Sequence, residues 1–169
     1  MNERRNVSMA VFEIGFVVLV LSVLAALVVP TVMRKIKERR TIEATENLRV
    51  LFNASVEYYQ RQLDDDSLDP TRARFPAGTP AHPPAIGRRP VTTSDWHMVD
   101  AFRELGFEIT EPHFYQYAYE SEGEGENARF TVSAFGDLDG DGHTSRFQME
   151  GYVEGGEVRG RTIVVDRLE

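Results

Sequence analysis

The sequence predicts an α+β protein in which a long N-terminal helix, membrane-spanning in its first half, packs on a small antiparallel β-meander. Residues 14–33 form an apolar run without a charged side chain, and the apolar residues of 34–62 recur at steps of three and four. Stretches within residues 113–166 alternate between polar and apolar side chains. A period near 3.6 indicates an amphipathic helix, and a period of two indicates half-buried strands.

The apolar run from Ile14 to Met33 is long enough to cross a lipid bilayer as a helix. Its 20 residues would span about 30 Å, which matches the hydrocarbon thickness. A cleaved secretory signal fits less well, because its apolar core is shorter and ends at small residues, whereas this run continues into the basic residues 34–40. Glu13 lies at the edge of the run, where a carboxylate is costly, and Pro30 predicts a kink.

The stretch from Met9 to Pro30, MAVFEIGFVVLVLSVLAALVVP, resembles the class III signal segment of type IV pilins and type II secretion pseudopilins. That family has a short basic leader, a glutamate at the fifth mature residue and a proline at the twenty-second. Counting back from Glu13 and from Pro30 places the cut at the same bond, between Ser8 and Met9. The family usually has glycine and phenylalanine at these two positions, so the chain departs from the pattern there.

The resemblance implies a leader of residues 1–8, a transmembrane and polymerisation helix of residues 9–33, and cleavage by a prepilin peptidase that also methylates the new amine. The amine of Met9 would pair with Glu13 of a neighbouring subunit, and a buried pair of this kind would fix register more than it adds stability. Pro30 would let the helix loosen during assembly. The implied partners are other pilin or pseudopilin subunits, the peptidase, an inner-membrane assembly platform and the membrane.

The resemblance also implies a single-pass protein of the bacterial inner membrane, with its head in the periplasm or, after assembly, in an extracellular filament. Basic residues alone indicate the opposite orientation, because residues 34–40 are more basic than the leader and basic flanks usually stay in the cytoplasm. The pilin resemblance is the more specific of the two signals, so we expect the head outside the cytoplasm.

Beyond the apolar run, the helix is expected to continue through residues 34–62, and a Pro- and Gly-rich loop to occupy residues 63–95. Trp96–Leu105 predicts a short helix capped by Ser94 or Asp95. Four antiparallel strands follow within residues 96–169, and a Gly-Gly turn joins the last two. The residues expected in the core include Ile42, Leu48, Leu51, Phe52, Ser55 and Tyr59 on the helix, and Tyr115, Tyr117 and Tyr119 on the first of the four strands.

The charge balance and the lack of cysteine exclude several classes of function. Residues 41–169 carry 12 Lys and Arg against 24 Asp and Glu. Nucleic-acid binding needs the opposite sign, so no nucleic-acid partner is expected. The chain has no cysteine, which excludes thiol catalysis, cysteine-based zinc sites and disulfides.

Alternating aspartates after the second predicted strand indicate a candidate Ca²⁺ site. Asp137, Asp139 and Asp141 are followed by Gly142, and carboxylates at every second residue can converge on one cation. His143 would supply a backbone ligand. An EF-hand needs a glutamate at the twelfth position, which is Gln148 here, and helices rather than strands around the loop. The alternative is a hairpin loop in which Asp and Gly serve turn geometry.

Catalytic motifs are absent from the sequence, so we expect a protein that is not an enzyme. The four histidines are scattered, and neither an HExxH pair nor a GxSxG elbow occurs. The sequence therefore predicts a structural subunit, a minor pilin or pseudopilin of a type IV pilus or a type II secretion filament. The alternative is an uncleaved, membrane-anchored extracytoplasmic domain that binds calcium or acts in adhesion.

Overall fold

The computed structural model describes the backbone of residues 3–84, 87, 89–92, 94–138, 140 and 142–166, and the side chains of these residues except 3–12, 30, 31, 33–40 and 164–166. The chain divides into two compact units, residues 1–39 and residues 40–169. We call the second unit the head. The elements are α1 (Glu3–Leu63), the 3-10 helix η1 (Pro70–Arg72), β1 (Thr79–His82), the 3-10 helix η2 (Trp96–Met98), α2 (Asp100–Leu105), β2 (Gln116–Glu122), the 3-10 helix η3 (Gly125–Asn127), β3 (Arg129–Gly136), β4 (Ser145–Glu154) and β5 (Glu157–Asp166).

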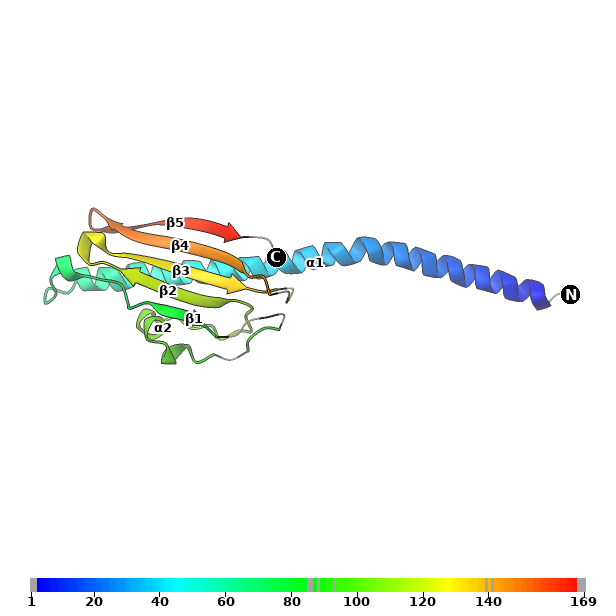
Figure 1. Cartoon of the computed structure of the whole chain (residues 1–169), viewed down its shortest axis with the longest axis horizontal. Coiled ribbons are helices and arrows are strands. Elements are labelled where there is room, and N and C mark those ends of the chain that lie inside the picture. The colour runs from blue at the N-terminus through cyan, green and yellow to red at the C-terminus, as the bar shows by residue number, and fades with distance from the viewer. Residues whose placement is uncertain are drawn as a thin grey trace. The chain divides into compact units, whose positions relative to one another are not determined.

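The head contains one antiparallel sheet in which strands next to each other in sequence are paired, in the order β1-β2-β3-β4-β5 (Figure 1). The four strands expected from the sequence agree with β2 to β5. Gly155 and Gly156 connect β4 to β5, and both have positive φ, 61° and 79°. Two positive φ values suit a tight hairpin whose twist matches that of the flanking strands, and glycine adopts them without a steric penalty.

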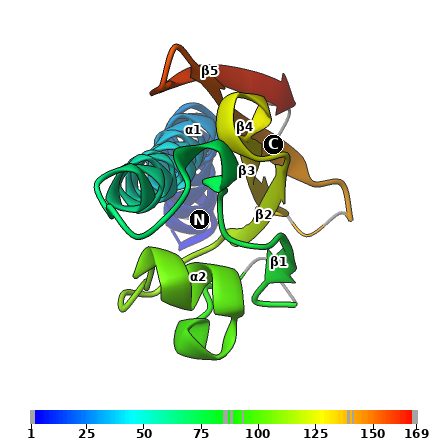
Figure 2. The same cartoon turned by 90° about the vertical axis from the view of Figure 1, so that its left-hand side faces the viewer.

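Residues 44–59 of α1 pack on the sheet through one face of the helix (Figure 2). The fully or almost fully buried residues of this face follow one another at steps of four and three, namely Ala44, Leu48, Leu51, Ser55 and Tyr59. Phe52 is half-buried beside them. Ile42 was expected in the same face but is 58% exposed. It lies two residues before Ala44, about 200° away around the helix, so it points away from the sheet.

Two tyrosines of β2 tie the sheet to α1 by hydrogen bonds as well as by packing. The Tyr117 hydroxyl accepts a hydrogen bond of 2.8 Å from the side-chain amide of Asn47. The Tyr119 hydroxyl donates one of 3.0 Å to Ser55 Oγ, which itself donates to the Leu51 carbonyl. Burial raises the pKa of both phenols, so they remain neutral donors and acceptors. The expected role of the tyrosine row as core is therefore confirmed.

Glycines in the sheet make room for aromatic rings that lie flat on it. A Cβ at Gly151 in β4 would overlap the ring of Phe130, and one at Gly160 in β5 would overlap the ring of Phe52. The two rings are 5.4 Å apart. A glycine in a strand interior usually weakens the strand, and close approach of another group is the usual reason for its presence.

The expected fold class is wrong in its membrane-spanning half. Among the residues that the structure describes, no helix is long and apolar enough to cross a membrane. The same finding contradicts the expected location of the chain as a single-pass protein of the bacterial inner membrane.

The segment before β2 also differs from the sequence-based expectation. Strand β1 lies within residues 63–95, where only a loop was predicted, and it pairs with β2 through an irregular register. The short helix predicted over Trp96–Leu105 consists of η2 and α2, with Val99 in an extended conformation between them. Asp95 is the N-cap residue of η2, as expected, but its side chain makes no capping hydrogen bond. The N-cap residue of α2 is Val99.

The packing of α1 on the sheet predicts that Leu51→Ala destabilises the protein by about 2–5 kcal/mol, since it leaves a cavity in a fully packed core. The measurement is urea unfolding followed by circular dichroism. Val50→Ala is the matched control, because Val50 is on the same helix and 53% exposed. It should change the free energy of unfolding by no more than about 0.5 kcal/mol. Equal effects of the two substitutions would contradict the assigned helix face.

Candidate functional site

The loop between β3 and β4 is held by the carboxylate of Asp137. One oxygen of Asp137 accepts a hydrogen bond of 2.6 Å from the Gly140 N–H, and the other accepts one of 3.2 Å from the Gly142 N–H. Both glycines have positive φ, 72° and 88°. Leu138 is buried in the core, so the loop is anchored by an apolar side chain that the sequence pattern did not single out.

Of the proposed calcium ligands, the structure describes Asp137 and His143, whereas Asp139 and Asp141 lie outside the described residues. His143 is exposed. Within the described part of the chain, no group of three or more His, Asp or Glu side chains could hold a metal ion. Each oxygen of Asp137 keeps a lone pair after accepting one N–H, so the carboxylate could still coordinate a cation. Calcium binding by this loop therefore stays a prediction.

The proposed processing and assembly residues all belong to α1. Ser8 and Met9 lie near its start and Pro30 lies within it, with side chains outside the described set. Glu13 is exposed. Every large apolar side chain described between residues 14 and 32 is at least 40% exposed. A contiguous apolar surface of this kind is typical of an interaction site rather than of a free protein surface.

The polar side chain inside this apolar stretch is satisfied by the helix itself. The Ser22 hydroxyl donates a hydrogen bond of 2.7 Å to the carbonyl of Val18, four residues earlier. A serine bonded in this way needs no partner from outside. The surface of residues 14–29 therefore presents apolar groups and small residues, and can be covered by another apolar surface without leaving that hydroxyl unpaired.

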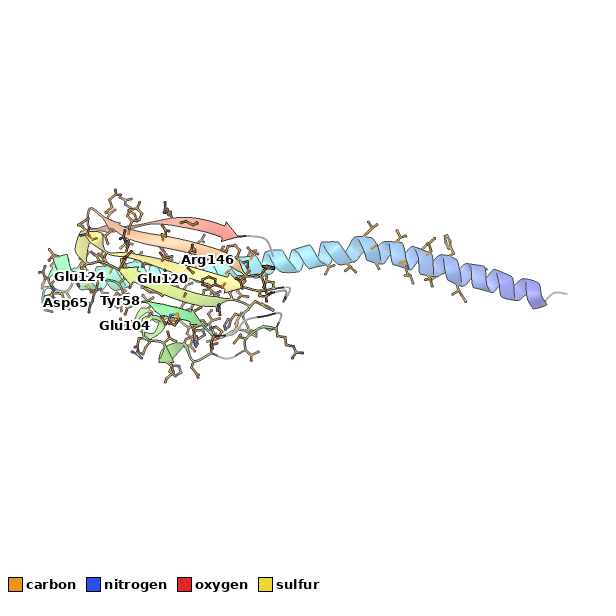
Figure 3. All side chains as sticks on the ribbon, viewed as in Figure 1. Tyr58, Asp65, Glu104, Glu120, Glu124 and Arg146 are labelled. Atoms are coloured by element: carbon orange, nitrogen blue, oxygen red, sulfur yellow. The ribbon has the colours of Figure 1, made fainter. Side chains whose placement is uncertain are left out.

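A surface cavity of about 440 Å³ is lined by Tyr58 of α1, residues 74–77, Glu104 of α2 and residues 121–124. Figure 3 labels Tyr58, Glu104 and Glu124. Tyr58 donates a hydrogen bond of 3.0 Å to Glu104, and Arg74 forms an ion pair of 3.9 Å with Glu124. Burial raises the pKa of Tyr58, and the bond to Glu104 adds to this shift. Because these lining groups already bind one another, the cavity offers little uncompensated charge to a ligand.

His82, Trp96 and His113 form a cluster that the sequence did not predict, in which Trp96 and His113 are buried and His82 is half-buried. The ring centroids of His82 and His113 lie 5.0 Å and 5.5 Å from that of Trp96. His113 is 1% exposed and Trp96 is equally buried. The three residues come from β1, η2 and the segment before β2, with no regular spacing in the sequence. Only the tertiary fold brings them together, so no sequence signal could have found the cluster.

A scan of protein-family models, a search of curated proteins and a search of solved structures each gave no match to this chain.

The β3–β4 loop predicts a response to calcium. We expect about 10 mM CaCl₂ to raise the melting temperature by about 3 °C or more, because a cation bound to the native state with a dissociation constant near 1 mM adds about 1.4 kcal/mol. Asp137→Ala should remove this gain, whereas Asp66→Ala, at an exposed position outside the loop, should keep it. An equal effect of MgCl₂, or none of CaCl₂, would contradict a calcium site and leave Asp137 as a turn residue.

Proposed function

We propose that the protein is a structural subunit of a pilin-like filament, of the type IV pilus or type II secretion kind, and that its N-terminal helix packs against the same helix of other copies. A prepilin peptidase would first remove residues 1–8. The sequence support is the resemblance of residues 9–30 to the pilin signal segment. The structural observation that carries the proposal is the exposed apolar surface of residues 14–32.

This surface needs a partner for an energetic reason. Burying apolar area contributes about 25 cal/mol per Å², or about 1.5–3 kcal/mol for each large aliphatic side chain. In the single chain, Phe16 and Leu19 are 60% and 61% exposed, and Leu27 is 65% exposed. A helix that is apolar on all sides is normally buried. Packing against several neighbouring helices would cover all its sides at once.

The shape of the stretch favours helix–helix contact. A Cβ at Gly15 would meet no atom within 4 Å, and Ala25 and Ala26 add a second site of small side chains. Small residues let helix backbones approach closely. Because the Ser22 hydroxyl donates a hydrogen bond within its own helix, close packing there would not leave that hydroxyl buried without a hydrogen-bond partner.

Glu13 would set the register between subunits. It is exposed at the edge of the apolar stretch and lies four residues after the proposed new N-terminus at Met9. A free amine at Met9 of one subunit could pair with Glu13 of the next. Removing one partner of a buried ion pair costs about 3–5 kcal/mol, because it leaves the other charge unpaired.

Disulfide crosslinking tests the helix contact directly, because the chain has no native cysteine. Leu21→Cys, at a position 59% exposed in the apolar stretch, should give oxidised dimers when subunits pack through this helix, since a disulfide forms only when the two Cβ atoms lie about 4 Å apart. Glu57→Cys, at an exposed position of the head, is the control and should give few. Equal yields from the two variants would contradict helix packing.

Processing and assembly can be measured separately. Treatment with a prepilin peptidase should yield a chain whose mass and N-terminal sequence begin at Met9. Glu13→Ala should still be cut but should assemble about 100-fold less well, as expected for breaking a buried pair. Glu46→Ala, which alters an exposed glutamate of the head, is the control. A chain that keeps Met1 would favour the uncleaved, anchored domain instead, and normal assembly of Glu13→Ala would remove the pairing role.

A further inference from the structure

The part of the head that contains His82, Trp96 and His113 is attached to β2 by the pairing of β1 and by the contacts of Trp96 and Phe107 with Tyr117. This part consists of the described residues between 79 and 113, with β1, η2 and α2, and we call it the cover. Strand β1 has four residues and pairs with β2 at the edge of the sheet. The Trp96 ring packs against Phe102 and Phe107 within the cover, at centroid distances of 5.3 Å and 5.2 Å, and against Tyr117 of β2 at 6.1 Å.

The surroundings of the His113 ring determine which protonation state is stable when the cover is closed. Nδ1 lies 3.2 Å from the carbonyl oxygen of Glu111. A carbonyl only accepts, so Nδ1 carries the hydrogen, and Nε2 of the neutral ring is unprotonated. Within the described part of the chain, this buried Nε2 has no hydrogen-bond partner. A second proton would therefore create a charged N–H group in a place that offers it no acceptor.

His82 is in the same situation on the other side of Trp96. Its Nε2 atom is also buried without a hydrogen-bond partner among the described residues. The pKa of His82 is lowered by burial, and the charge of Asp95 partly offsets this effect. Burial likewise lowers the pKa of His113, the hydrogen bond to the Glu111 carbonyl partly offsets this effect, and the nearby His82 lowers the pKa further. A positive charge on either ring would therefore disfavour protonation of the other ring.

We propose that His82 and His113 form an acid-sensitive latch, and that their protonation below about pH 6 releases the cover from β2 while β2 to β5 stay packed on α1. Both rings must be neutral for the cover to close. In the open cover, water would solvate both charges.

The charged groups around the cluster do not compensate two imidazolium charges. Asp95, at the start of η2, is exposed, so water screens its charge. On α2, Asp100 and Arg103 form an ion pair with each other. On α1, Glu43 accepts a hydrogen bond of 2.8 Å from the Phe114 N–H. Among the described residues, the Glu111 carbonyl oxygen lies 3.2 Å from His113 Nδ1, and the Tyr117 ring of β2 packs on Trp96. The Tyr117 phenol stays neutral because burial raises its pKa.

The latch would act on the cover and not on the rest of the head. The chain's two other histidines, His97 and His143, are exposed and lie outside the cluster. The contact of α1 with β2 and β3 consists mainly of aliphatic and aromatic side chains, with neutral hydroxyls and the Asn47 amide among its polar groups. Local opening of one cooperative segment, with the remainder intact, is a common form of native-state fluctuation.

The direction and steepness of the pH effect follow from proton linkage. Both histidines have a lower pKa in the closed cover than the ordinary value of 6.5. Closure is therefore fully favoured above about pH 6.5 and becomes less so as the pH falls through the lowered values. Between these limits the ratio of open to closed molecules should rise about 100-fold per pH unit when two protons are taken up, and about 10-fold when one is.

The fluorescence of the chain can report the opening of the cover, because Trp96 is its one tryptophan. The experiment follows tryptophan emission and acrylamide quenching of the full chain, dispersed in a mild detergent, from pH 8 to about pH 5, where most carboxylates stay ionised. We expect a red shift of the emission and greater acrylamide access on acidification. Far-ultraviolet circular dichroism should keep most of its signal over the same range.

Substitutions of the two histidines separate the latch from general acid effects. His82→Phe keeps an aromatic ring beside Trp96, and His113→Asn keeps a donor for the Glu111 carbonyl. Each should reduce the steepness to about one proton, and the double variant should stay closed to about pH 5. His97→Gln is the matched control, because His97 is exposed and adjacent to Trp96. It should behave as the unmodified chain does.

Three results would overturn the proposal. The first is an unchanged Trp96 emission in the unmodified chain down to about pH 5. The second is an acid transition of equal steepness in a double variant whose melting temperature at pH 8 matches that of the unmodified chain. The third is a loss of intensity without a red shift or new acrylamide access, which would mean that an imidazolium quenches the indole inside a closed cover. The first and third results need only the unmodified chain, so they test the proposal even if a variant fails to fold.

Discussion

The hydrogen-bonded contact of β2 with α1 is the constraint on which the rest of the head depends. Two buried phenols, Tyr117 and Tyr119, can be satisfied only if Asn47 and Ser55 face them. An unpaired buried hydroxyl would cost about 1–3 kcal/mol, so these bonds determine how α1 is rotated against the sheet. That rotation buries Leu48 and Leu51, and the remaining strands then add to β2 in chain order.

The two units of the chain meet the need for burial in different ways. The head has its own core, built from one helix face, the inner face of a sheet and the aromatic residues of the cover. In residues 1–39 the described apolar side chains of α1 have no such core within the chain. This contrast is the physical basis of the proposal that assembly involves the first unit. It leaves the head, with its acidic surface, free to stay folded whether or not the subunit is assembled.

Local patterns predicted the elements whose burial follows from the chain itself. Alternation along β2 to β5 located those strands, because each has one face on the core, and the Gly-Gly pair located their last turn. Ile42 was misplaced because three- and four-residue steps fit several faces of a helix, and only the position of the sheet selects one. Strand β1 was missed because it is short and contains Pro80. The membrane-spanning half was predicted from the uncharged length of 14–33, whereas no helix among the described residues is long and apolar enough to cross a membrane.

The sequence by itself determined the periodicities: an apolar stretch without charge, a helix with one apolar face, four alternating strands and an aspartate-rich loop. It also determined the resemblance over residues 9–30. Only the tertiary structure decided that Asp137 closes its loop through two glycine amides, and that His82 and His113, 31 residues apart in the chain, lie on either side of Trp96. Periodicity reports what each residue does within its own element, whereas contacts between elements depend on how the whole chain folds back on itself.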